Sequence, residues 1–235
     1  MGQKKLLRFN AIKNFSNVLE YPEGIKGKWA DFFKNDHPIT LELACGKGEY
    51  SISLGREQQE RNFIGVDIKG NRIYTGAKKA LAEGLNNVAF LRAQIGQLTQ
   101  YFSAGEVGEI WIIFPDPFLR ESKAKNRLTH ARFLRLYQQV LPPGARIHLK
   151  TDSKELYDFT QESIAENNCV IHENIADIYG RGKAVGPLAI QTFYESMHLA
   201  EGRTIYYLSF SLPEQTIVPP PRKKKEVDTD DACDA

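Results

Sequence analysis

Two glycines and two acidic residues in the first part of the chain have the spacing of a nucleotide-type cofactor site. Gly46 and Gly48 follow an apolar, β-rich run and precede a stretch with helical character. Glycine lets the chain turn sharply there and lets a ligand approach without a Cβ in the way. Glu42 lies four residues before the first glycine, and Asp67 ends the next apolar run, nineteen residues after Gly48. In doubly wound folds an acid at that place accepts hydrogen bonds from ribose hydroxyls.

The same residues favour S-adenosylmethionine over a dinucleotide as the cofactor. The dinucleotide fingerprint G-x-G-x-x-G needs a third glycine, and Ser51 stands at that position. A carboxylate at Glu42 would repel a pyrophosphate, whereas it suits the ammonium and sulfonium charges of S-adenosylmethionine. We therefore predict S-adenosylmethionine as the cofactor and S-adenosylhomocysteine as its product. From these residues alone, the alternative is a tight turn that binds no ligand.

Asp116 is the candidate for the central chemical role. It follows the run Ile110–Phe114, which is so apolar that both faces of the strand must be buried, and it stands between Pro115 and Pro117. Prolines restrict φ and bias the preceding residue to extended geometry, which fixes where the carboxylate points. Ligands of open α/β sheets bind beyond the carboxyl ends of the strands, so we expect Asp116 to face the methyl group of the cofactor. The structural alternative is an ordinary Asx-turn.

Strands and helices that alternate along the chain must position these residues. The pattern predicts strands at 39–44, 63–68, 87–93, 108–114, 145–152, 169–175 and 203–212, and helices at 49–59, 71–83, 129–140 and 155–167. Such alternation implies βαβ units, and therefore a parallel sheet with right-handed crossovers. The last strand has alternating apolar character and is expected to run antiparallel to the others. The predicted fold class is α/β, doubly wound, with helices on both faces.

The composition excludes several classes of protein. With 235 residues, 42% hydrophobic and 26% charged, the chain is typical of a globular protein and not of a fibre or a disordered chain. It has neither the run of about 20 apolar residues that spans a bilayer nor the apolar core of a signal peptide. Cys45, Cys169 and Cys233 are widely spaced, which argues against a disulfide framework and against a zinc or other metal site. A cytoplasmic location is expected.

Charge is distributed unevenly along the chain. The net charge is only +2, yet residues 117–150 hold eight Lys or Arg and a single Glu. Such a basic segment is typical of a surface that binds a polyanion, although a solvated helix face is the simpler reading. We predict three regions: a basic arm with a short helix at 1–38, the main domain at 39–212, and a charged, disordered tail at 213–235.

The chain resembles the bacterial tRNA (guanine-N7-)-methyltransferases from about Ile39 to Leu212. The motifs that carry the likeness are LELACGKGEY, FIGVDI, FPDPF, KAKNRLTHARFL, LKTD and QTFYE, in this order. The glycine-rich motif is shared by many methyltransferases, but FPDP followed by a basic run and a late T-x-x-E is much more specific. The resemblance implies a Rossmann-like class I methyltransferase fold with a mostly parallel seven-stranded sheet, whose last strand is antiparallel.

The resemblance also implies roles for individual residues. Glu42, Gly46, Gly48 and Asp67 would bind S-adenosylmethionine, with Asp67 on the ribose. The cofactor-binding residues would also include Gln94, near the adenine, and Asp116, which is in addition the catalytic or substrate-orienting acid. The residues implied to bind the substrate are Arg120, Asp152, Thr192, Phe193, Tyr194 and Glu195. Three positions depart from the family pattern: Phe118 replaces Trp, Arg120 replaces Lys, and Gln94 replaces Asp.

These residue types suit methyl transfer to guanine N7. This nitrogen already has a free lone pair, so the reaction needs no general base, and alignment of the reactants can supply up to ~7–11 kcal/mol. Asp116 would accept the guanine N1–H and N2–H and stabilise the positive charge that develops on the base. Phosphates of the tRNA partner would bind a basic cluster formed by Arg120, Lys123, Lys125 and Arg127, together with Lys4, Lys5 and Arg8.

Two other functions are compatible with parts of this pattern. One is a methyltransferase that acts on an exocyclic amino group, although Asp116-Pro117-Phe118 lacks the second proline of the (N/D)-P-P-(Y/F) motif of those enzymes. The other is an RNA-binding protein without turnover, which the joint presence of Glu42, Asp67 and Asp116 argues against. A monomer and a homodimer are both compatible with the sequence, and no membrane partner is expected.

Overall fold

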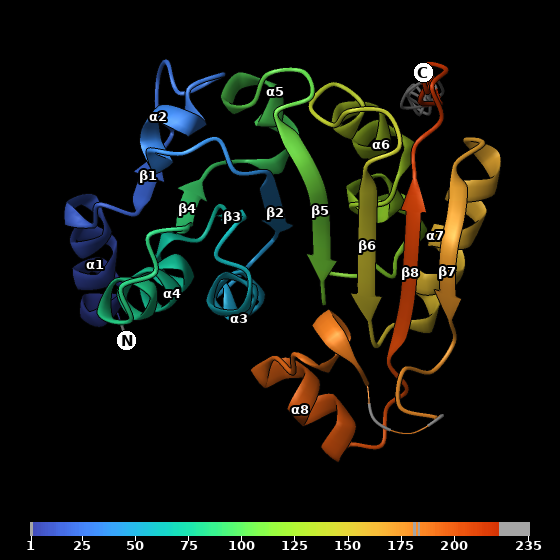
Figure 1. Cartoon of the computed structure of the whole chain (residues 1–235). Coiled ribbons are helices and arrows are strands. Elements are labelled where there is room, and N and C mark those ends of the chain that lie inside the picture. The colour runs from blue at the N-terminus through green and yellow to red at the C-terminus, as the bar shows by residue number, and fades with distance from the viewer. Residues whose placement is uncertain (1, 181, 183, 221–235) are drawn as a thin grey trace, which may run out of the picture.

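One mixed β-sheet organises the chain (Figure 1). The computed structural model describes residues 2–180, 182 and 184–220. In this part of the chain the strands lie in the order β1-β4-β3-β2-β5-β6-β8-β7. Their bounds are β1 Val18–Glu20, β2 Ile39–Leu43, β3 Asn62–Asp67, β4 Val88–Arg92, β5 Val107–Ile113, β6 Arg146–Thr151, β7 Val170–Ile175 and β8 Tyr206–Ser211.

The sheet confirms the predicted doubly wound α/β fold. All neighbouring strands pair in parallel except at β8, which is antiparallel to both β6 and β7. Seven strands were predicted, and the described residues form eight because β1 adds itself beside β4. This strand comes from the region that the sequence suggests is an arm. Its three residues are too few for a recognisable alternation of apolar and polar side chains.

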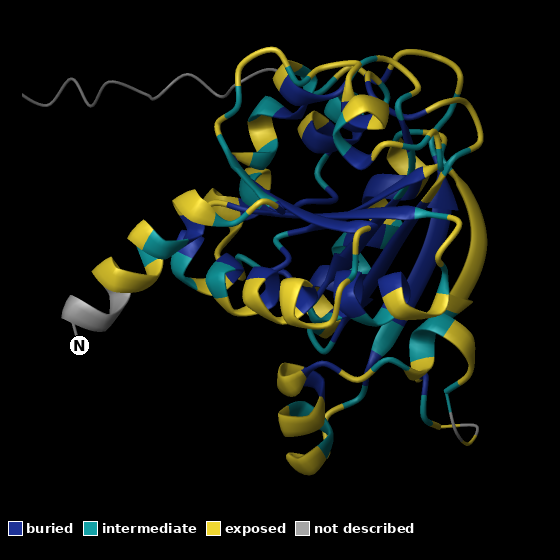
Figure 2. Cartoon of the chain, turned by 60° about the vertical axis from the view of Figure 1, so that its left-hand side comes forward, coloured by how far each residue is buried: buried dark blue, intermediate teal, exposed yellow. Residues whose placement is uncertain are grey.

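Helices cover both faces of the sheet. The described helices are α1 Gly2–Ala11, α2 Trp29–Phe33, α3 Glu49–Glu57, α4 Gly70–Ala82, α5 Leu98–Tyr101, α6 Ala131–Tyr137, α7 Lys154–Glu166 and α8 Phe193–Ala200, with short 3₁₀ turns η1 Ile12–Asn14, η2 Ile95–Gln97, η3 Glu121–Asn126 and η4 Gly186–Ala189. One apolar cluster joins the sheet to α2, α5, α6 and α7, and a second joins it to α3 and α4. Buried residues accordingly lie in the sheet and on the inward sides of the helices (Figure 2).

The predicted helices are present with shifted ends. The stretch 129–140 gives only the shorter helix α6, because His130 caps it by accepting a hydrogen bond from the Arg132 amide. Helix α8 was not predicted, although Thr192 and Glu195 form a complete capping box at its start. The T-x-x-E pattern is a known signature of a helix N-terminus, so the sequence does carry a signal for α8.

The beginning of the predicted tail is attached to the domain. Ile217 is buried in the larger apolar cluster, and its amide donates to Gln138 Oε1 over 2.9 Å. The Gln138 side-chain amide in turn donates to the carbonyl oxygens of Pro213 and Gln215. Residues 221–235, with the basic run that begins at Arg222, lie outside the described residues.

The chain connections define where a ligand can bind. From β2 the chain continues outward to β3 and β4, whereas β5 is followed by β6 on the other side. The strand order therefore reverses between β2 and β5, and in open α/β sheets the crevice beyond such a reversal is the usual ligand site. The glycine loop follows β2 and the FPDPF loop follows β5, so both predicted motifs emerge at this crevice.

Helix α4 packs against the glycine loop so closely that Gly76 has no room for a side chain. A Cβ there would lie 2.2 Å from the Lys47 carbonyl oxygen and 2.8 Å from the Phe90 ring. We expect Gly76→Ala to destabilise the protein by about 1–3 kcal/mol, because the loop backbone must shift. Urea unfolding measures this, with Gly96→Ala as the control, since a Cβ at Gly96 meets nothing within 4 Å. Equal stability of the two variants would contradict the expectation.

Candidate active site

The glycine loop leaves open space at Gly46. Ala44, Gly46 and Gly48 all have left-handed backbone, with φ of 57°, 56° and 64°. At Gly48 a Cβ would collide with the Phe90 ring at 2.3 Å, so only glycine fits. At Gly46 a Cβ would meet nothing within 4 Å. A ligand can therefore approach the backbone of this loop directly at Gly46.

Asp67 connects the loops that follow β2 and β3. One carboxylate oxygen accepts from the Gly46 amide over 2.9 Å and the other from the Lys69 amide over 2.7 Å. The side chain is nearly buried, so these two bonds fix its orientation. Each oxygen can accept a further hydrogen bond, which is what a ribose hydroxyl would require.

Glu42 lies inside β2 and is almost inaccessible. Its Oε2 accepts from both the amide and the hydroxyl of Ser51, over 2.8 and 2.6 Å. Burial raises the pKa of Glu42 to about 7, while the hydrogen bonds from Ser51 oppose that shift. Sequence reasoning used Ser51 only to argue against a dinucleotide; in the structure it holds the carboxylate beside the start of α3. A cation next to Glu42 would favour its ionised form.

The FPDPF loop leaves β5 through an unusual backbone conformation. Phe114 and Phe118 both have positive φ, 45° and 44°, which is uncommon for bulky residues. The Phe114 amide still bonds to the Lys150 carbonyl oxygen, and the chain then leaves the sheet. Asp116 is exposed, and its Oδ1 accepts from the Phe118 amide over 3.2 Å. The Asx-turn considered as the structural alternative is thus present, and it engages one oxygen of an accessible carboxylate.

The basic segment divides into an outer and an inner part. Arg120, Lys123 and Lys125 are exposed on and beside η3. Arg127 is only 6% exposed, so the prediction that it grips phosphates is wrong. The 3₁₀ turn ends just before it and directs its guanidinium inward, toward the FPDPF loop.

Asp152 follows β6 and is engaged by two residues from the end of the α8 region. Its Oδ2 lies 2.7 Å from the Arg203 guanidinium and 3.6 Å from His198 Nδ1. His198 also packs against the Phe114 ring, with the ring centroids 5.7 Å apart. Neither Arg203 nor His198 belongs to a predicted motif.

The T-x-x-E segment plays two structural parts. Glu195 is completely buried, where it pairs with Lys150 at 2.6 Å and accepts from the Tyr179 hydroxyl at 2.7 Å. Thr192 is also buried and caps α8. Phe193 and Tyr194 are half exposed. The sequence expectation joined all four residues in one substrate surface, but only the two aromatic side chains reach the surface here.

Helix α8 lies against the glycine loop. The Phe193 amide donates to Glu49 over 2.9 Å, and Lys47 Nζ lies 4.7 Å from the centroid of the Phe193 ring. A hollow of about 270 Å³, whose lining includes Lys47, Glu49, Gly76 and Gln191, borders this contact. The fold thus joins the T-x-x-E segment to the glycine loop, while Gln94 is exposed after β4, the strand next to β3.

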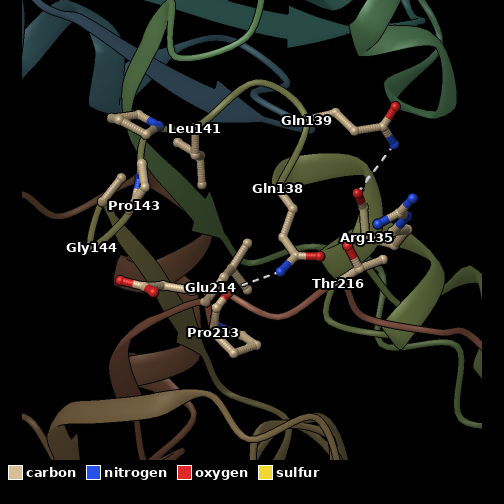
Figure 3. A pocket seen from close by; sticks show the side chains of 12 residues that line it. Arg135, Gln138, Gln139, Leu141, Pro143, Gly144, Pro213, Glu214 and Thr216 are labelled. Carbon is tan, nitrogen blue, oxygen red and sulfur yellow. Dashed lines mark hydrogen bonds between the residues drawn. The ribbon is translucent and has the colours of Figure 1, made fainter.

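A second hollow lies far from these motifs. It has a volume of about 190 Å³ and is lined by Arg135 of α6, by the connection from α6 to β6 with Gln138, and by the segment after β8 with Glu214 (Figure 3). It lies at the amino end of β6, opposite the edge that holds Asp116 and the glycine loop.

Within the described part of the chain, no group of three His, Cys, Asp or Glu side chains could hold a metal ion, and no helix is long and apolar enough to cross a membrane.

Comparison with known proteins agrees with this arrangement. The family model described as "Putative methyltransferase" matches residues 36–208. The solved 16S rRNA methyltransferase KamB superposes with a TM-score of 0.62 over 84% of this chain and 99% of that one, at 15% identity, which shows a shared fold. The fold is therefore that of a Rossmann-like methyltransferase.

Curated relatives define the family more narrowly. A tRNA (guanine-N(7)-)-methyltransferase of Porphyromonas gingivalis is 48% identical, covering 86% of this chain and 87% of that protein. One of Bacteroides thetaiotaomicron is 42% identical, covering 97% and 93%. The chain belongs to the tRNA (guanine-N7-)-methyltransferase family, a family of S-adenosylmethionine-dependent enzymes.

The raised pKa of Glu42 predicts a pH-dependent stability. Between its ordinary value of 4.5 and about 7, the folded protein holds a proton that the unfolded chain has lost. Stability therefore falls as pH rises through this window, by about 3 kcal/mol in total. Glu42→Gln, which stays neutral, should match the wild type near pH 5 and be more stable by about that amount at pH 8.

Urea unfolding of both proteins at a series of pH values measures this difference. Glu57→Gln, which changes an exposed glutamate at the end of α3, is the control and should not show the trend. A Glu42→Gln difference that stays constant from pH 5 to pH 8 would contradict the prediction.

Proposed function

We propose that this protein transfers the methyl group of S-adenosylmethionine to N7 of a guanosine in the variable loop of tRNA. The observation that carries the proposal is that the glycine loop and the loop with the accessible Asp116 follow neighbouring parallel strands, β2 and β5, at the reversal of strand order, in a chain of this family. Relatives with this name argue against an exocyclic amino acceptor and against an RNA-binding protein without turnover.

The residues beside β2 and β3 fit S-adenosylmethionine. The open space at Gly46 admits a ligand to the loop backbone, Asp67 can accept from the ribose hydroxyls, and the carboxylate of Glu42 complements a cationic cofactor. Gly48 keeps the loop in the required conformation, and Gln94 is available to the adenine. When bound, S-adenosylmethionine supplies an electrophilic methyl group, and the product is S-adenosylhomocysteine.

On the acceptor side the protein has to orient a base that is already nucleophilic. Asp116 would accept the guanine N1–H and N2–H, holding N7 in line and stabilising the cationic product. The exposed rings of Phe193 and Tyr194 offer stacking surfaces, and Arg120 offers a charge to the tRNA backbone. Asp152 would contact the substrate in place of Arg203, with which it forms an ion pair in this structure. Thr192 and Glu195 would contribute through the position of α8.

Partner and location follow from the same reaction. The exposed Arg120, Lys123 and Lys125 support binding of tRNA phosphates, and the tRNA substrate supports a cytoplasmic location. For the domain organisation we retain residues 39–212 as the catalytic domain. The region 1–38 extends its sheet through β1, and the tail begins beyond the attached segment around Ile217.

Transfer of label to unmodified tRNA tests the proposed reaction directly. The protein is incubated with methyl-labelled S-adenosylmethionine and an unmodified tRNA transcript, and the labelled nucleoside is identified by chromatography. We expect 7-methylguanosine at a variable-loop position, and none from a transcript in which that guanosine is replaced by adenosine. Label in N6-methyladenosine, or no transfer at all, would refute the proposal.

The role of Asp116 is tested by Asp116→Asn. An amide can no longer accept two N–H groups as a charged carboxylate, so kcat should fall on the order of 100-fold. The Kd for S-adenosylmethionine, measured by calorimetry, should change by less than about threefold, since the residue acts on the acceptor. Asp36→Asn, which changes an exposed loop residue far from Asp116 in the sequence, is the matched control. Unchanged kcat in Asp116→Asn would exclude the role.

A further inference from the structure

Arg127 is a buried cation that holds the FPDPF loop. Its Nε donates to the Pro117 carbonyl oxygen and its Nη2 to the Phe118 carbonyl oxygen, each over 3.2 Å. The guanidinium carbon lies 4.4 Å from the centroid of the Phe159 ring, on α7. In the described residues, no carboxylate forms an ion pair with it. Its charge is met instead by two carbonyl dipoles and an aromatic face.

The loop that Arg127 holds has few hydrogen bonds of its own, although the Phe114 ring packs against His198 and the apolar cluster of α3 and α4. Pro115 and Pro117 have no amide hydrogen to donate. Phe114 and Phe118 are in the left-handed region, which costs bulky residues on the order of 1–2 kcal/mol each. Within the loop, the Phe114 amide donates a hydrogen bond to the Lys150 carbonyl oxygen and the Phe118 amide donates one to the Asp116 carboxylate. A conformation of this kind persists only where its surroundings impose it.

Arginine is suited to this task and lysine is not. The planar guanidinium presents several donors in a fixed fork, which here reach the carbonyl groups of two successive residues, Pro117 and Phe118. It also stacks on a ring while doing so. A lysine ammonium at the end of a flexible chain can bond to either carbonyl but does not reproduce the paired geometry.

Arg127 also connects the loop to the exposed part of the basic segment. It follows η3 directly, and its amide donates to the Ala124 carbonyl oxygen over 2.9 Å. Lys123 and Lys125, on either side of the buried Ala124, point outward. One short 3₁₀ turn therefore carries the exposed charges and is followed directly by the anchor of the Asp116 loop.

We propose that Arg127 is a positioning residue, which holds Asp116 in the orientation that methyl transfer requires and links it to the exposed basic turn. The inference rests on the proposed role of Asp116. Arg127 therefore differs in function from its neighbours. The exposed lysines bind the nucleic acid, while the buried Arg127 orients Asp116, the residue that binds the acceptor base.

Three variants separate positioning from phosphate binding. Arg127→Met should lower kcat by about 10- to 100-fold, as expected for a misplaced catalytic group, with the Kd for S-adenosylmethionine within about twofold of wild type. Its tRNA affinity should keep the salt dependence of the wild type. The double variant Lys123→Met/Lys125→Met should reduce the slope of log K against log salt by about 1–2. Arg127→Lys should recover only part of the kcat.

Two results of this comparison would overturn the inference: an unchanged kcat in Arg127→Met, or a salt slope reduced as in the lysine variant. Should Arg127→Met fail to fold, as judged by circular dichroism and thermal melting, Arg127→Lys undergoes the same measurements with the same criteria.

A double-mutant cycle with Asp116→Asn distinguishes this inference from the proposed function itself. If Arg127 acts through Asp116, Arg127→Met should lower kcat by less than about threefold in the Asp116→Asn background, because the two losses are then not additive. If Asp116→Asn lowers kcat but Arg127→Met adds its full loss on top, the positioning role is excluded and the function of Asp116 stands. If Asp116→Asn leaves kcat unchanged, both proposals fail.

Discussion

The site depends on two backbone reversals at the carboxyl ends of neighbouring strands. β2 is followed by Ala44 and β5 by Phe114, and both residues have positive φ although neither is glycine. Each reversal costs free energy, on the order of 1–2 kcal/mol, and must be stabilised by its surroundings. After β2, the amides of Cys45 and Gly46 bond to Val66 and Asp67 of the adjacent strand. After β5, the Phe114 amide bonds to β6. The two loops therefore leave the sheet side by side in fixed directions.

Buried charge joins the remaining parts of the site to this centre. Lys150, at the end of β6, is fully enclosed with Glu195 and also donates to the carbonyl oxygens of Leu188 and Ile190. These bonds attach η4 and α8 to the sheet. Removal of one partner would leave an uncompensated charge in the interior, which costs about 3–5 kcal/mol. The pair thus ties the segment with Phe193 and Tyr194 to β6, the strand that Asp152 follows.

Catalysis of N7 methylation makes modest chemical demands but strict geometric ones. The acceptor nitrogen needs no deprotonation, so the protein's contribution is alignment and charge stabilisation. This agrees with a site in which acidic groups are held by amides, as Asp67 is, or by a hydroxyl and an amide, as Glu42 is. It also agrees with the contacts that hold the loops and α8 in place. Arg127 donates to the FPDPF loop, Gly76 packs against the glycine loop, and Glu49 accepts from the first residue of α8.

The sequence by itself determined the fold class, the positions of the main strands along the chain, and the motifs that follow β2 and β5. These depend on local information: apolar periodicity, the spacing of Gly46, Gly48 and Asp67, and the prolines around Asp116. Only the tertiary structure decided which charged side chains face solvent. Arg127 and Lys125 are two residues apart in one basic run, yet one is buried and the other exposed. Likewise Glu195 is enclosed because Lys150, 45 positions earlier, lies opposite it. The burial of a charge depends on partners that folding brings from distant positions, and no local pattern contains them.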